Sequence, residues 1–173
     1  MTKPLPCHSL ARSISIMALC LMLAPRATIG AVRTASEPYA FQVRVTLSEK
    51  AAATLKRLNE GVVISASYSG DPRPSAKKHA DQIGRIALGI QNVEIPGRPA
   101  TVIVSGSHVR RGRVAWIRGP VLLNVNVYSA RRSGPDNILA CDFFDGTLKS
   151  AARRTVPIHC SLIAEKADTQ HLS

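Results

Sequence analysis

Hydrophobic and polar residues alternate along most of this chain in short runs, a pattern typical of β-strands with one buried face. The strictest alternation covers residues 41–47, where four apolar residues share one face: Phe41, Val43, Val45 and Leu47. Residues 121–128 form a second strict run, with Asn124 and Asn126 on the face opposite the valines. We expect that asparagine face to be partly hydrated or hydrogen-bonded across to a neighbouring strand.

Further β-rich runs are separated by turn residues. They predict strands over residues 62–68, 83–94, 100–105, 114–118, 138–144 and 156–164. Gly84 and Gly89 indicate a bulge or bend within one of these runs. Pro96-Gly97 predicts a turn in which glycine takes a positive φ, and Gly119-Pro120 predicts a break. Asp145-Gly146 is the strongest short hairpin signal in the chain.

One segment has helical rather than strand periodicity. Ser48 stands where an N-cap belongs, and Ala51, Leu55 and Leu58 follow at helical spacing. Basic residues fall in the expected last turn, and Gly61 follows as a stop. The pattern predicts a helix over residues 49–59. Residues 70–82 are expected to form a basic, proline-containing loop.

Many short strands at regular spacing, with a single helix, favour a β-sandwich. We expect an all-β fold: a two-sheet antiparallel β-sandwich of about seven or eight strands with one short helix after the first strand and one disulfide. The segment from Asp81 to Gly106 resembles prealbumin-like sandwich domains, in which a strand, a Pro-Gly-type turn and another strand follow one another. The resemblance implies an immunoglobulin/prealbumin-like sandwich and assigns no role to any residue.

The first thirty-one residues have the order of a secretory signal. Lys3 and Arg12 precede an apolar run over residues 14–24, and small residues end the segment. We expect residues 1–31 to be a cleaved signal peptide, with an uncleaved membrane anchor as the alternative. A short polar lead (32–40), a single sandwich domain (41–164) and a flexible tail (165–173) are expected to follow. The location is then periplasmic or secreted.

The cysteines divide between the signal and the rest of the chain. Cys7 and Cys20 leave with the signal, whereas Cys141 and Cys160 remain. Two cysteines in an oxidising compartment predict one disulfide. A metal-binding pair or a reactive thiol is the alternative, although neither cysteine has a C-x-x-C partner. No later apolar run is long enough to suggest a transmembrane span.

The chain is strongly basic, with a formal net charge of +12. Removal of residues 1–31 takes away three basic and no acidic residues, which leaves +9. Such a charge favours contact with an anionic polymer or glycolipid of the cell envelope, or with nucleic acid. The alternative is that the charge only keeps an exported protein dissolved.

The arginines cluster in predicted loops and at strand ends. Because the loops of a sandwich gather at its two ends, several arginine groups could form one anion-binding surface. Arginine suits that role because its planar guanidinium can bind phosphate or carboxylate at two points. The candidate anion-binding residues are Arg110, Arg111, Arg113, Arg131, Arg132, Arg153 and Arg154.

Nucleic acid is the less favoured anion. The few aromatic residues are not interleaved with the basic pairs, as stacking platforms would be. Trp116 is expected to pack in the core or against the sheet. An exported protein is also separated from nuclear or cytosolic nucleic acid.

The sequence argues against an enzyme. It contains no G-x-S-x-G, H-E-x-x-H or P-loop motif, so we expect no catalytic residue, cofactor or metal site. Its histidines lie in separate segments. Asp142 is expected to pair with a nearby arginine, from residues 131–132 or 153–154.

Three function classes are therefore weighed. The first is an exported, non-enzymatic sandwich that binds an anionic envelope component, or a partner protein, through its basic loops. The second is a protein-interaction module, such as an assembly factor, inhibitor or surface subunit, that acts through sheet edges or apolar faces. A small envelope hydrolase is the least favoured class.

Overall fold

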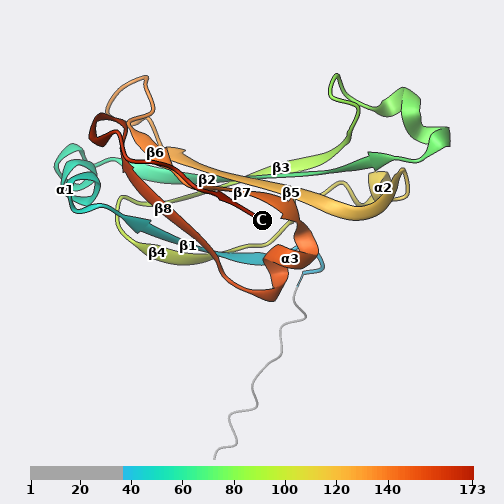
Figure 1. Cartoon of the computed structure of the whole chain (residues 1–173), viewed down its shortest axis with the longest axis horizontal. Coiled ribbons are helices and arrows are strands. Elements are labelled where there is room, and N and C mark those ends of the chain that lie inside the picture. The colour runs from blue at the N-terminus through green and yellow to red at the C-terminus, as the bar shows by residue number, and fades with distance from the viewer. Residues whose placement is uncertain (1–36) are drawn as a thin grey trace, which may run out of the picture. The chain divides into compact units, whose positions relative to one another are not determined.

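Two β-sheets make up the part of the chain that the computed structural model describes, residues 37–173 (Figure 1). The four-stranded sheet has the order β4-β1-β8-β6, with bounds Phe41–Leu47 (β1), Ala100–Val104 (β4), Leu139–Cys141 (β6) and Val156–Leu162 (β8). The five-stranded sheet has the order β3-β2-β5-β7-β9, with bounds Gly61–Pro72 (β2), Ile86–Pro96 (β3), Ile117–Ser129 (β5), Phe143–Thr147 (β7) and His171–Leu172 (β9). The signal peptide expected over residues 1–31 lies outside the described residues.

The two sheets share one hydrophobic core. Val43 and Val45 of β1 and Ile158 of β8 face into it from the four-stranded sheet. Ile64 of β2 and Val125 of β5 face into it from the five-stranded sheet. The strict alternation of β1 is confirmed, since its residues are buried and exposed in turn along the strand. A mostly β fold of two sheets around one core follows.

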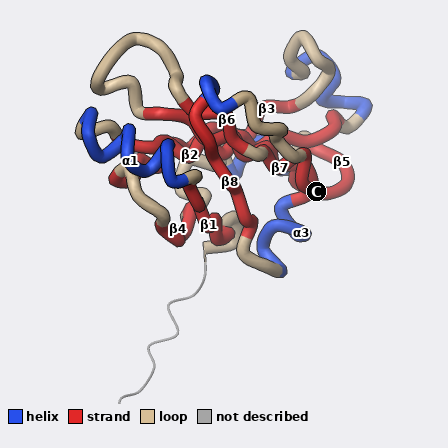
Figure 2. Tube along the Cα trace, turned by 60° about the vertical axis from the view of Figure 1, so that its left-hand side comes forward, coloured by secondary structure: helices blue, strands red, loops and turns tan. Residues whose placement is uncertain are grey.

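Helices lie at the margins of the sheets (Figure 2). The single helix expected is present as α1, Glu49–Leu58, although further helical segments occur besides it. The Ser48 hydroxyl accepts a hydrogen bond from the Ala51 N–H at 3.0 Å. Asn59, at φ 50°, ends this helix, whereas Gly61 already belongs to β2. Within the described residues no helix is long and apolar enough to cross a membrane. The further helical segments are the 3-10 turns η1 (Pro74–His79) and η2 (Ile163–Glu165) and the short helices α2 (Arg111–Val114) and α3 (Leu148–Arg153).

The expectation of purely antiparallel sheets is wrong. β1 pairs with β4 in antiparallel but with β8 in parallel, and β7 pairs with β9 in parallel. Both parallel partners are far apart along the chain, so no short hairpin dictates their direction. Alternation shows which face of a strand is buried, but it carries no information on which strand lies beside it. Residues 165–173, expected as a tail, supply β9.

The prediction of a hairpin turn at Asp145-Gly146 is also wrong. Both residues lie inside β7, where Asp145 pairs with Asn124 and Gly146 with Leu123. Directly after them Thr147 caps α3, and its hydroxyl accepts a hydrogen bond from the Ser150 N–H. The chain therefore continues into a helix that leads to the other sheet and does not turn back on itself.

The strand expected over residues 114–118 is only partly present. α2 occupies residues 111–114, and β5 begins at Ile117. The break expected at Gly119-Pro120 is a bulge within β5, where the register against β2 shifts between Ser69 and Asp71. Gly119 adopts φ +74° there, which costs glycine little. The bulge lets one continuous strand run through a position that the sequence marks as an end.

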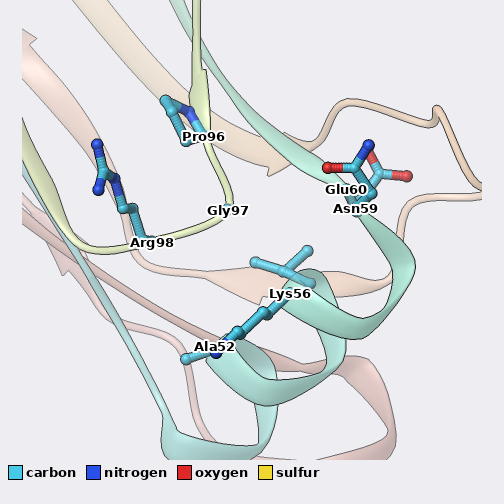
Figure 3. Close-up of a pocket in the computed structure, with 8 residues that line it drawn as sticks. Ala52, Lys56, Asn59, Glu60, Pro96, Gly97 and Arg98 are labelled. Atoms are coloured by element: carbon cyan, nitrogen blue, oxygen red, sulfur yellow. The ribbon is translucent and has the colours of Figure 1, made fainter.

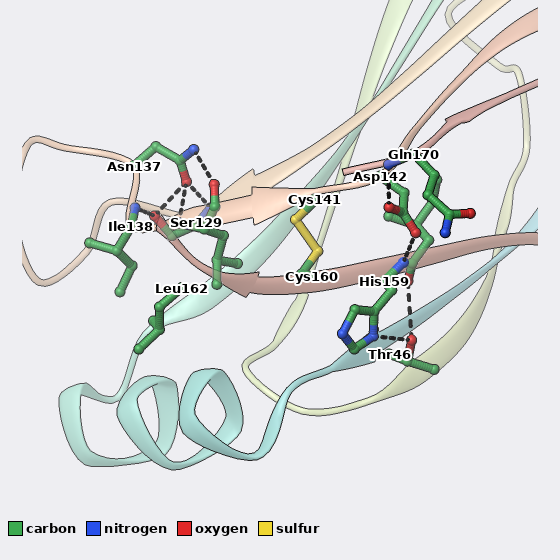
Figure 4. The surroundings of a disulfide bond; sticks show 12 residues. Thr46, Ser129, Asn137, Ile138, Cys141, Asp142, His159, Cys160, Leu162 and Gln170 are labelled. Carbon is green, nitrogen blue, oxygen red and sulfur yellow. Dashed lines mark hydrogen bonds between the residues drawn. A yellow bond between two sulfur atoms is a disulfide. The ribbon is translucent and has the colours of Figure 1, made fainter. Parts of the chain in front are cut away.

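The expected disulfide is present, and it joins adjacent strands. Cys141 of β6 and Cys160 of β8 face each other in register, with 4.0 Å between their Cα atoms (Figure 4). β6 is short and lies at the edge of its sheet, paired with β8 alone. The cross-link therefore fastens this edge strand to the strand beside it.

We predict that replacing both cysteines, Cys141→Ser with Cys160→Ser, lowers the midpoint of thermal unfolding. Closing a loop of this size stabilises a fold by about 3 kcal/mol on the chain-entropy model. Thermal unfolding followed by circular dichroism measures the effect, and the reduced wild-type protein should match the variant. An unchanged midpoint would show that the bridge is not structural.

Candidate functional site

The arginine group at residues 110–113 lies on a connection at one end of the five-stranded sheet. The chain leaves β4, passes the edge of β3 and turns through α2 into β5. The Arg110 N–H donates to the carbonyl of Leu88 at 2.8 Å, and Arg113 Nη1 donates to the carbonyl of Ala87 at 3.0 Å. Both bonds attach the basic segment to the edge strand β3. The arginines are therefore held at a defined place beside the sheet.

A second basic segment, η1, meets this group at Trp116. The Arg73 N–H donates to the carbonyl of Trp116 at 2.8 Å, and Arg73 Nε donates to the carbonyl of Ile117 at 2.9 Å. His79, at the other end of η1, stacks on the Trp116 ring with 4.4 Å between the ring centres. The guanidinium of Arg113 lies 5.7 Å from the centre of the same ring. Trp116 thus holds two basic segments together.

We call this surface the basic end. It comprises the ends of β2, β3 and β5 with the connections between them, and its basic residues are Arg73, Lys77, Lys78, His79, Arg85, Arg110, Arg111, Arg113 and Arg118. Three acidic residues lie among them: Glu37, Asp71 and Asp81. Positive charge exceeds negative charge here, so the basic end is a surface suited to anions.

The acidic residues at the basic end have local roles. Glu37 forms an ion pair with Arg111 at 2.8 Å, and both side chains are more than half exposed. Asp81 Oδ1 accepts hydrogen bonds from the N–H groups of Ile83 and Arg85 and so shapes the turn before β3. Lys77, Lys78 and Arg110 are exposed and form no ion pair within the described residues. These three cations are open to a ligand.

The arginines at positions 131 and 132 lie at the opposite end of β5. The strand has 13 residues, so it separates the two groups by roughly 40 Å. Arg132 forms an ion pair with Glu94, and the Arg131 guanidinium lies 5.7 Å from the centre of the Tyr128 ring. The two groups do not share one anion-binding surface.

A buried carboxylate holds the loop that carries Arg131 and Arg132. Glu60 is 4 % exposed, and its Oε2 accepts hydrogen bonds from the N–H and the hydroxyl of Ser133 at 2.8 and 2.7 Å. Its Oε1 accepts from the N–H of Gly61 at 2.9 Å. Burial raises the pKa of Glu60, but the hydrogen bonds from Ser133, Arg132 and Gly61 outweigh it and lower the pKa from 4.5 to about 2. At this end of the sheet the Glu60 carboxylate therefore occupies the position next to the loop and holds it by hydrogen bonds.

A cavity of about 390 Å³ lies between α1 and the turn after β3, next to Glu60 (Figure 3). Lys56 and Arg98 line it together with the Glu60 carboxylate. A Cβ on Gly97 would stand 2.3 Å from the carbonyl oxygen of Glu60, so only glycine fits there. Close approach therefore explains this glycine, and the positive φ expected for it is absent. The carboxylate is already occupied by its internal hydrogen bonds.

The third arginine group follows α3. Arg153 ends that helix and is exposed, and Arg154 Nη2 donates to the carbonyl of Ser173 at 2.9 Å. The contact joins the start of β8 to the C-terminal residue. We find for Arg154 a structural contact, and for Arg153 no contact that indicates a role.

Asp142 and His159, which lie beside the disulfide, have structural partners (Figure 4). Asp142 accepts hydrogen bonds from the N–H groups of His159 and Gln170 at 3.1 and 2.7 Å, and not from an arginine as expected. The His159 ring contacts the Thr46 hydroxyl at 3.0 Å on the exposed face of the four-stranded sheet. A triad requires a carboxylate on the imidazole ring, whereas Asp142 binds the backbone of His159.

The other titratable groups do not gather either. In residues 37–173 no set of three or more His, Cys, Asp or Glu side chains is placed to hold a metal ion. His108 contacts the carbonyl of Ile90, and His171 stacks on Phe143. Each histidine contacts its own neighbour, so no shared centre forms within the described chain.

The anion-binding residues predicted from the sequence include the 110–113 group but none of η1. The adjacent lysines Lys77 and Lys78 are the sequence feature that could have indicated η1 as part of the site. Trp116, on which the adjacent His79 stacks, could not be found from the sequence, because it lies almost forty residues away along the chain. Comparisons with protein-family models, with curated proteins and with solved structures found no match.

We predict that acid removes the contribution of Glu60 to stability. Its pKa is lower in the folded protein than in the unfolded chain, so the contribution is complete above pH 4.5 and is lost as the pH falls through about 2. Glu60→Gln should lower the unfolding midpoint at neutral pH and flatten its decline across this range. Asp136→Asn is the control: it changes an exposed carboxylate in the loop that Glu60 holds through Ser133, and it should leave the profile as in the wild type. Parallel profiles for wild type and Glu60→Gln would contradict the assignment.

Proposed function

We propose that the protein is an exported, non-enzymatic β-sandwich that binds an anionic component of the cell envelope at the basic end. The observation that carries the proposal is the meeting of η1 and residues 110–113 at Trp116. Two basic segments more than thirty residues apart in the chain contribute to one surface. Hydrogen bonds to the backbone carbonyls of Trp116, Ile117 and Leu88 hold them there before any ligand binds.

Phosphate is the anion that this set of side chains suits best. Lysines act as mobile point charges, and arginines can bind two oxygens of one phosphate. Lys77, Lys78 and Arg110 supply both kinds of group on an exposed surface. A preformed surface loses less conformational entropy on binding than loops that must first become ordered. A phosphate-rich polymer or glycolipid fits this description.

The disulfide supports the location. Structural disulfides persist in oxidising compartments such as a periplasm or the outside of a cell. Cys141 and Cys160 form such a bond between paired strands. The proposal therefore places the anion binding in the cell envelope or outside the cell.

A protein-interaction module is the second candidate, and one observation favours it. An apolar groove lies between α1 and the end of β8, lined by Leu58, Ile138, Leu162 and Ile163 among others, and Ile163 is 52 % exposed. Burial of such a surface against a protein would be insensitive to salt, whereas phosphate contacts weaken as ionic strength rises. Salt dependence thus distinguishes the two candidates.

We predict that removing three cations from the basic end weakens binding to immobilised polyphosphate. The variant is Lys77→Ala with Lys78→Ala and Arg110→Ala. Each cation near an anionic surface contributes about 1 kcal/mol, so affinity at low salt should fall roughly tenfold or more. Surface plasmon resonance at low and high salt measures the change, and the wild-type affinity should also fall with salt.

The control removes the same number of cations from α1: Lys50→Ala, Lys56→Ala and Arg57→Ala. These residues are exposed on a helix beside the other end of β2. The control should keep most of the wild-type affinity, and both variants should keep the wild-type unfolding midpoint within a few degrees. Equal losses in the two variants would show that net charge alone, and not the basic end, determines binding.

A further inference from the structure

A groove of about 350 Å³ lies on the outer face of the five-stranded sheet. β2, β5 and β7 form its floor, and the segment that leads into β3 forms one wall. Its floor is lined by Ser67, Ser69, Leu122, Asn124 and Asp145. This is the face on which the alternation of residues 121–128 placed the asparagines.

The floor of the groove contains one polar row across three strands. Ser67 of β2 pairs in register with Asn124 of β5, and Asn124 pairs with Asp145 of β7. A hydroxyl, an amide and a carboxylate therefore lie side by side on one face. One row along, Ser69 pairs with Leu122, which adds a second hydroxyl and an apolar side chain.

Most of these polar groups are not used within the protein. In the described chain, the hydroxyls of Ser67 and Ser69 form no hydrogen bond to protein atoms, and Asp145 forms no ion pair. Asp81 uses Oδ1 for backbone N–H groups, which leaves Oδ2. Asn124 Oδ1 accepts from Asn126, and its amide N–H groups remain. The groove thus offers several donors and acceptors with few internal partners.

This chemistry suits a sugar better than a phosphate. Two carboxylates, Asp81 and Asp145, line the groove and would repel an anion placed inside it. They accept hydrogen bonds from hydroxyl groups, and the serines and Asn124 can both donate and accept. Leu122 and the exposed Ile83 supply apolar surface for the C–H faces of a sugar ring.

The groove joins the basic end directly. Arg85 belongs to both, and Ala87, which lines the groove, accepts through its carbonyl the hydrogen bond from Arg113 at 3.0 Å. Two residues beyond Ser69 along β2, Asp71 pairs with Arg118 of the basic end. A ligand in the groove would therefore have cations next to it on one side.

We propose that the groove holds one sugar unit of a phosphorylated saccharide, whose phosphate groups lie against the basic end. This inference rests on the proposed function, in which the basic end binds phosphate. It adds the class of ligand, which is a saccharide polymer that carries phosphate. Hydroxyl recognition and phosphate recognition are assigned to different side chains, so they can be removed separately.

The test uses Ser67→Leu, which fills the groove, and Ser65→Leu as its control. Ser65 lies on the same face of β2, pairs with Asn126 and Asn92 and does not line the groove. The probes are phosphorylated glucan, phosphorylated mannan, the same two polymers without phosphate, and polyphosphate. Binding is measured by surface plasmon resonance, and circular dichroism verifies that both variants fold.

Ser67→Leu should weaken binding of at least one phosphorylated polysaccharide by about tenfold and leave polyphosphate binding unchanged, whereas Ser65→Leu should change neither. Equal affinity of wild type and Ser67→Leu for both phosphorylated polysaccharides would overturn the groove assignment, even if polyphosphate still binds. Absence of polyphosphate binding would overturn the proposed function. If polyphosphate does not bind but an unphosphorylated polymer does, and Ser67→Leu abolishes binding of that polymer, the sugar site in the groove is still supported.

Discussion

The antiparallel pairing of β2 with β5 is the constraint on which the rest of the molecule depends. These are the two longest strands, and their register runs from Val62 opposite Ser129 to Pro72 opposite Ile117. Side chains alternate across a strand, so the same pairing places Ile64 and Val125 in the core and Ser67 and Asn124 on the outer face. A slip by one residue would exchange the two faces, and the burial of the inner set opposes such a slip.

The two ends of this strand pair differ in electrostatic character. At one end Arg73, Arg113 and their neighbours surround Trp116, and positive charge is in excess. At the other end the buried carboxylate of Glu60 binds the 131–136 loop through Ser133, and Glu94 pairs with Arg132. At this second end both carboxylates are thus engaged by the protein itself, one by Ser133 and one by Arg132. The first end leaves several cations exposed, which is why it is the better candidate for a ligand.

The disulfide and Asp142 hold the two shortest strands, β6 and β9, in the structure. β6 has three residues and β9 has two, so neither strand could hold its position by pairing alone. The Cys141–Cys160 bond fixes β6 to β8. Asp142, next to the disulfide, accepts hydrogen bonds from the backbone of His159 and of Gln170, and so connects β8 to the segment before β9. The Asp142 carboxylate thus contributes to the fold through backbone hydrogen bonds and not through the arginine pair expected from the sequence.

The sequence by itself determined the local features: which face of β1 and β5 is buried, the helix after β1 with its Ser48 cap, and the pairing of Cys141 with Cys160. Each depends on residues within a few positions of one another, or on a choice between very few partners. Only the tertiary structure decided that β1 lies parallel to β8 and that Ser67, Asn124 and Asp145 form one row. It also decided that His79 and Arg113 meet at Trp116, while Arg131 lies at the far end of β5. These arrangements depend on contacts between segments far apart in the chain. Alternation records which face of each segment is buried, but the order of strands in a sheet follows from the packing of the whole core.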